Sequence, residues 1–195
     1  ERTHFGQVIE RNPLERLMTE LSTSASFNDR KRQIDVFNKK NRWKKRGISM
    51  IPTKFGIAFT ATFMNQAGAL VHIYRDGTVR VAHGGIEMGQ GLHTKMIQVA
   101  ATVLGIPTDA VFIAETSTDT VPNSSPTAAS ASSDLYGMAV LLAAKQLEER
   151  LRPVREKLGP EAAFREITEA AYFQQIDLCA HGFYKTPDIF MDWDA

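Results

Sequence analysis

The chain has 195 residues, 43% of them hydrophobic and 23% charged, which is typical of one globular domain or two small ones. Its 23 basic residues exceed its 22 acidic residues by one, so net charge favours neither a nucleic-acid binder nor a protein of acidic membranes. No apolar run approaches the roughly 20 residues of a membrane-spanning helix. The single cysteine, Cys179, excludes an internal disulfide and a cysteine cluster for zinc or iron–sulfur, and is compatible with a cytoplasmic protein.

Residues 1–46 are predicted to be helical and basic. The chain opens on Glu1 without an initiator methionine, which suggests that it begins inside a longer polypeptide. Pro13 and the spaced leucines after it predict a helix that ends in the serine-rich run 22–26, and a second helix is predicted at about 28–41. The nine basic residues between 30 and 46 are typical of a solvated helix face followed by a basic loop, which we favour, or of a polyanion-binding surface.

Strands are predicted from Gly47 onward, at 48–51, 55–63 and 69–74. Asp76-Gly77 then predicts a hairpin, because both residues tolerate the positive φ of a primed turn. The second strand of this hairpin, 78–83, leads directly into a turn that contains four glycines.

That glycine-rich turn, 84–91, precedes a helix predicted at 92–104 and ended by Gly105. Backbone N–H groups at a helix start carry positive potential and suit an anionic ligand such as a phosphate. The spacing of the glycines matches neither the dinucleotide fingerprint nor the Walker lysine pattern. On spacing alone, a tight strand-to-helix turn without a ligand is the favoured interpretation.

The remaining pattern predicts a short strand at 111–114, a hydroxyl-rich stretch, and a long helix that starts at Pro126 and is kinked or ended near Pro153. A helix around 162–171 and a strand at 176–184 follow. The small residues near Thr127 fit a second anion-binding site and close helix packing equally well. The predicted fold class is α+β, with mixed strands and packed helices.

Four strings in this chain together resemble one family: IPTKFGIAFT, GGIEMGQGLHTKM, ETSTDTVPNSSPTAASASSDLYG and GFYKTPD. They are similar to the molybdenum-binding part of xanthine dehydrogenases, in the molybdenum hydroxylase family that includes aldehyde oxidases, and the likeness covers roughly 30–188. The resemblance implies a partial molybdenum-pterin-binding domain over 1–195, with a helical, basic segment at 1–46 and the cofactor region at 47–195. It favours ligand binding over a purely structural role both for the glycine-rich turn and for the small residues near Thr127. It also argues against nucleic acid as a partner.

The resemblance also implies a site. Molybdenum would be held by the dithiolene of molybdopterin, without a protein cysteine. Phe59 and Thr60 would border a purine substrate, and Ala129 would approach the molybdenum without a side-chain ligand. The residues expected to line the cofactor are Met88, Gly89, Gln90, Thr127, Ala128, Ala129, Ser130 and Ser132.

Other parts of the family's machinery have no counterpart here. The general-base glutamate of a Gly-Glu-Pro-Pro segment is missing, so no catalytic residue is assigned in this chain, and Glu87 is expected to be solvated or paired. FAD, 2Fe-2S clusters and NAD are expected on other segments or subunits of a dimeric enzyme of purine catabolism that converts hypoxanthine and xanthine to urate. The alternatives are an aldehyde oxidase-type hydroxylase, or a non-catalytic binding module when the chain is isolated.

Overall fold

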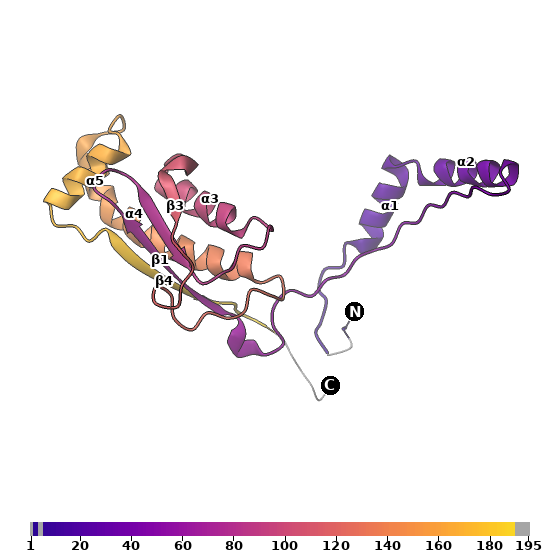
Figure 1. The fold of residues 1–195 in the computed structure, drawn as a ribbon, viewed down its shortest axis with the longest axis horizontal. Coiled ribbons are helices and arrows are strands. Elements are labelled where there is room, and N and C mark those ends of the chain that lie inside the picture. Colours follow the sequence, from indigo (N-terminus) through magenta and orange to yellow (C-terminus); the bar gives the residue numbers. More distant parts are fainter. Residues whose placement is uncertain (1, 4–5, 190–195) are drawn as a thin grey trace. The chain divides into compact units, whose positions relative to one another are not determined.

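The computed structural model describes residues 2, 3 and 6–189, which divide after Gly56 into two compact units. The first unit contains helices α1 (Leu14–Ser24) and α2 (Phe27–Lys40), both close to their predicted ranges. After α2 the chain returns alongside that helix (Figure 1), because the Asn38 amide bonds both the N–H and the carbonyl of Arg46 at 2.9 Å. Neither helix has a buried residue. The basic side chains between 30 and 46 are all exposed, as the favoured interpretation expects.

The second unit, 57–189, is built on a four-stranded sheet with the order β3-β2-β1-β4. Its strands are β1 (Gln66–Ile73), β2 (Val79–His83), β3 (Val111–Ile113) and β4 (Cys179–Lys185). The tight turn between β1 and β2 makes that pair antiparallel, while the crossover through helix α3 (Leu92–Leu104) makes β2 and β3 parallel. Strand β4 adds to the other side of β1, antiparallel to it.

Two long helices pack on this sheet (Figure 1): α3 contacts β2 and β3, and α4 (Ser132–Leu158) contacts β1 and β4. Helix α5 (Phe164–Phe173) packs on α4, and the short 3-10 helices η1 (Thr62–Met64) and η2 (Thr108–Ala110) complete the unit. The core between sheet and helices is apolar, and alanines on α4 allow a close approach. A Cβ on Gly182 of β4 would lie 1.9 Å from the carbonyl oxygen of Ala139. The α+β fold class is therefore confirmed.

The predicted strands at 48–51 and 55–63 were wrong, since neither range contains a strand. The buried amide of Asn65 explains the second case. It accepts a hydrogen bond from the N–H of Phe59 (2.8 Å) and donates to the carbonyls of Phe59 (2.9 Å) and Thr62 (3.2 Å). A side chain therefore satisfies the backbone groups that a sheet ladder would otherwise use.

The long helix starts at Ser132 rather than at Pro126. Ala129 and Ser130 have positive φ values, 53° and 52°, which no α-helix accepts, so the chain reaches the helix through an irregular turn. Pro153 lies inside α4 and does not end it.

The β1–β2 hairpin was predicted correctly, but its turn is of another kind. Gly77 has a positive φ (88°), whereas Asp76 does not. The Asp76 carboxylate accepts hydrogen bonds from the N–H (2.9 Å) and the hydroxyl (2.7 Å) of Thr78. One left-handed glycine thus replaces the two left-handed residues of a type I′ turn.

Candidate cofactor-binding site

Three segments far apart in sequence meet at one end of the second unit. The N–H of Ile86, in the glycine-rich turn, donates to the hydroxyl of Thr127 at 2.9 Å. The N–H of Ala58, just before the predicted substrate residues, donates to the carbonyl of Ala129 at 3.2 Å. The structure therefore brings together the segments that carry all of the predicted site residues.

A carboxylate of the glycine-rich turn bonds backbone N–H groups at the start of α3. One carboxylate oxygen of Glu87 accepts from the N–H groups of Gly89 (2.8 Å) and Gly91 (2.9 Å), and the other accepts from His93 (3.0 Å). These bonds, that from His93 first, lower the pKa of Glu87. The N–H groups of Gly89, Gly91 and His93 are therefore already bonded to a side chain of the turn. Glu87 is paired, as expected.

The Gln90 side chain bonds backbone groups that precede it in the turn, whereas Glu87 bonds groups that follow it. Its amide nitrogen donates to the carbonyl of Ile86 (2.9 Å), and its amide oxygen accepts from the N–H of Met88 (2.6 Å). A primary amide has two N–H groups and two lone pairs, so one of each remains for a ligand. Gln90 and Met88 are both exposed, and a Cβ on Gly89 would meet only open space. The rim of the turn can therefore contact a flat, heteroatom-rich molecule.

The glycines of this turn serve two different needs. Gly89 and Gly91 have φ values of 98° and 75°, which other residues rarely adopt. Gly84 and Gly85 instead allow a close approach. A Cβ on Gly84 would lie 1.7 Å from the hydroxyl of Ser124, and one on Gly85 would lie 2.5 Å from the Leu92 side chain.

Two histidines and a tyrosine lie behind the turn. His83 is 1% exposed, and its Nδ1 accepts from the N–H of Gly85 at 3.1 Å. The rings of His93 and Tyr136 lie 5.1 and 5.3 Å from it, centroid to centroid. Burial, and secondarily His93, lower the pKa of His83 to about 4, which keeps the ring neutral near pH 7. Sequence reasoning missed this group, although His83 ends a strand whose neighbours are apolar.

The segment 127–132, which forms the second predicted wall of the cofactor site opposite the glycine-rich turn, carries backbone strain at two of the predicted positions. Ala129 and Ser130 both have left-handed φ values, and each such residue costs of order 1 kcal/mol. Ser132 comes later and begins α4, where the neighbouring Ser133 accepts a hydrogen bond from Lys95 of α3 at 3.0 Å. A side-chain hydrogen bond thus connects the starts of α3 and α4.

The two predicted substrate residues differ in exposure. Phe59 is half-buried and packs against the core, held by the Asn65 amide, whereas Thr60 is exposed. A half-buried aromatic ring next to an accessible hydroxyl can hold the face and the edge of a planar molecule.

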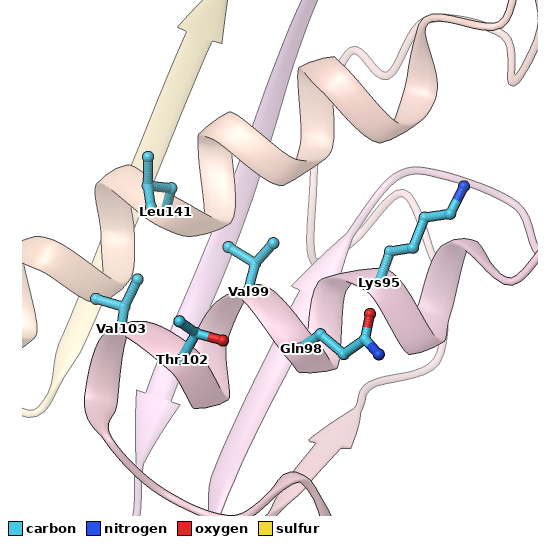
Figure 2. Close-up of a pocket in the computed structure, with 6 residues that line it drawn as sticks. All are labelled: Lys95, Gln98, Val99, Thr102, Val103 and Leu141. Atoms are coloured by element: carbon cyan, nitrogen blue, oxygen red, sulfur yellow. The ribbon is translucent and has the colours of Figure 1, made fainter.

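A separate open groove of about 320 Å³ lies between α3 and α4. Figure 2 shows its lining, in which valines of α3 and Leu141 of α4 form the floor. None of the predicted cofactor residues lines it. In residues 2, 3 and 6–189, no group of three or more His, Cys, Asp or Glu side chains could hold a metal ion. No helix in that part of the chain combines the length and apolarity needed to cross a bilayer.

Comparison with known proteins identifies the family of the chain. Xanthine dehydrogenase 1 of Arabidopsis thaliana is 58% identical over 191 residues, which is 98% of this chain and 14% of the plant protein. The xanthine dehydrogenase/oxidase of Felis catus is 54% identical over 187 residues, again 14% of its length. The chain thus spans about one seventh of these relatives.

Solved structures share the fold. Quinoline 2-oxidoreductase from Pseudomonas putida 86 aligns with a TM-score of 0.75 and 19% identity over 96% of this chain and 28% of its own. The aldehyde oxidoreductase of Desulfovibrio desulfuricans ATCC 27774 aligns with a TM-score of 0.65 and 17% identity over 98% of this chain and 20% of its own. The family described as molybdopterin cofactor-binding domain matches residues 20–195. The chain therefore belongs to the molybdopterin cofactor-binding domain family.

Proposed function

We propose that this chain is part of a xanthine dehydrogenase and forms one portion of the site that binds molybdopterin and purine. The observation that carries the proposal is the hydrogen bond between Ile86 and Thr127, because it joins the two predicted cofactor walls. The link from Ala58 to Ala129 adds the predicted substrate segment to the same place. High identity to xanthine dehydrogenases over nearly the whole chain supports the substrate class.

The residues present fit a pterin. Gln90 keeps one donor and one acceptor for the heteroatoms of the ring, and Met88 provides an exposed, polarizable side chain 67% accessible to solvent. Thr127, Ala128, Ala129, Ser130 and Ser132 would form the opposite wall. When bound, the molybdenum centre would supply the hydroxylation chemistry and accept the electrons of the substrate.

Phe59 and Thr60 would orient the substrate next to that centre. The half-buried ring of Phe59 would stack on the purine, and the exposed hydroxyl of Thr60 would bond its edge. The general base, the electron-transfer groups and the remaining molybdenum contacts would come from other portions of the parent enzyme, of which this chain is a small part. We infer that FAD, 2Fe-2S and NAD bind to those portions, in a cytoplasmic dimer.

The proposal is tested in the complete enzyme with Gln90→Ala and Thr60→Val. We expect Gln90→Ala to lower molybdenum content or turnover, because the amide both shapes the turn and faces the pterin. Thr60→Val should raise the KM for xanthine at normal molybdenum content. Wild-type molybdenum content and wild-type steady-state constants in both variants would refute the assignment.

Turnover of aldehydes without turnover of purines would instead indicate an aldehyde oxidase-type enzyme, which shares this fold. Salt-dependent nucleic-acid binding by an intact parent without molybdopterin would indicate a binding module that uses the basic residues 30–46.

A further inference from the structure

The carboxylate of Glu87 is the centre of the glycine-rich turn. It lies at the start of α3 and accepts three backbone hydrogen bonds, at 2.8, 2.9 and 3.0 Å. Two of the donors, Gly89 and Gly91, have left-handed φ values. A glycine is also free to adopt other conformations, so fixing two of them costs more conformational entropy than fixing other residues. Three bonds to one ionised group offset that cost, because hydrogen bonds to charged acceptors are stronger than those between neutral groups.

Gln90 lies between these two glycines. Its side chain completes the turn through Ile86 and Met88 and leaves one donor and one acceptor at the rim. The direction of that remaining pair depends on the conformations of Gly89 and Gly91, which the Glu87 carboxylate fixes. Glu87 itself is only half-exposed and turns both carboxylate oxygens toward the helix start. It therefore acts through Gln90 and not by contact with a ligand.

We propose that Glu87 is a positioning residue for the molybdopterin-binding turn, whose carboxylate sets the geometry in which Gln90 and Met88 meet the cofactor. This proposal rests on the proposed function, because it concerns the same turn. In this proposal, the Glu87 carboxylate also occupies the positively polarised N-terminus of α3. The turn would then hold the cofactor through side-chain groups at its rim, and not through helix N–H groups around a phosphate.

The test measures cofactor retention in the complete enzyme. Glu87→Ala removes both acceptor oxygens and thus all three hydrogen bonds, and Glu87→Gln keeps one oxygen for Gly89 and Gly91 but presents an NH₂ group toward His93. The matched control is Glu149→Gln, on the exposed side of α4, since Glu149 makes no ion pair among the described residues. Release of molybdenum and of oxidised pterin into buffer is followed over time, well below the melting temperature.

We expect Glu87→Ala to release the cofactor about tenfold faster or more, by analogy with the loss of groups that orient metal ligands. Glu87→Gln should give an intermediate rate, and the control should match the wild type. The melting temperature of the cofactor-free enzyme is measured in parallel. A rate increase that merely follows a lowered melting temperature would overturn the proposal in favour of a purely structural role.

Gln90→Ala in the same assay separates this inference from the proposed function. Faster release in Gln90→Ala with wild-type release in both Glu87 variants would refute only the positioning role. Wild-type release in all three variants would show that the turn does not hold the cofactor, and both proposals would fail. If Glu87→Ala does not accumulate, Glu87→Gln, which keeps the size and one acceptor, decides the outcome.

Discussion

The contact between Gly84 and Ser124 makes a sharp prediction about how the cofactor turn packs. A Cβ built on Gly84 would lie 1.7 Å from Oγ and 2.4 Å from Cβ of Ser124, while unstrained carbon contacts lie at about 3.5 to 4.0 Å. In Gly84→Ala the two segments must therefore separate by more than about 1 Å. We expect a loss of about 1 to 3 kcal/mol in the free energy of unfolding, the usual cost of overpacking.

Ser124→Gly in the Gly84→Ala background removes both clashing atoms. The nearest remaining atom is then the Tyr136 hydroxyl at 3.1 Å, a tight but tolerable contact. The double variant should recover most of the lost stability, with a coupling energy of about 1 to 2 kcal/mol in favour of the pair. The matched control is Gly56→Ala, where a Cβ meets nothing within 4 Å, and it should change stability by about 0.5 kcal/mol or less.

Urea unfolding of the chain, followed by circular dichroism at 222 nm, is measured for the wild type, Gly84→Ala, Ser124→Gly, the double variant and the Gly56→Ala control. Additive effects, with a coupling energy below about 0.5 kcal/mol, would refute the proposed contact between the two segments. In the complete enzyme, the same rescue should appear in molybdenum content, because the glycine-rich turn belongs to the proposed cradle.

Gly182→Ala should cost about 3 kcal/mol or more by urea unfolding, since its Cβ would lie 1.9 Å from the rigid backbone oxygen of Ala139. Gly137 lies in α4, as Ala139 does, and a Cβ there would meet only the flexible end of Met96 at 3.6 Å. Gly137→Ala should therefore stabilise the chain by about 0.5 to 1 kcal/mol. Similar effects of the two variants would contradict the packing of α4 on β4. His83 should make stability depend on pH, because the unfolded state binds its proton near pH 6.5 and the folded state only near pH 4. The free energy of unfolding should thus fall by about 3 kcal/mol as pH falls through this window, and His83→Gln, which does not titrate, should flatten the curve.

The sequence predicted those elements whose signals are local. The helices before residue 41 and at 92–104, the β1–β2 hairpin and the last strand all follow from periodicity and from glycine or proline at an end. The long helix was misplaced at its start because nothing local shows that Ala129 and Ser130 adopt left-handed conformations. The chain folds that way because the surrounding tertiary contacts, such as the bond from Ala58, hold the turn.

For the candidate site too, local features could be predicted from the sequence and tertiary contacts could not. Resemblance predicted which segments line the cofactor, and the structure brings these segments together. The partner of each polar group was not predictable, because Glu87 could face solvent or backbone with the same sequence around it. Only the fold shows that its carboxylate accepts hydrogen bonds from two N–H groups of its own turn and one of the helix that follows. His83 was likewise missed, since its role depends on the ring of Tyr136, more than fifty positions away.

The hydrogen bond from Ile86 to Thr127 spans 41 positions in sequence, and the one from Ala58 to Ala129 spans even more. Both bonds therefore join segments that only the folded unit brings together. Under the proposed function, a nascent or partly unfolded polypeptide would consequently lack the site for the prosthetic group. Insertion of the prosthetic group would then act as a checkpoint that only correctly matured molecules pass.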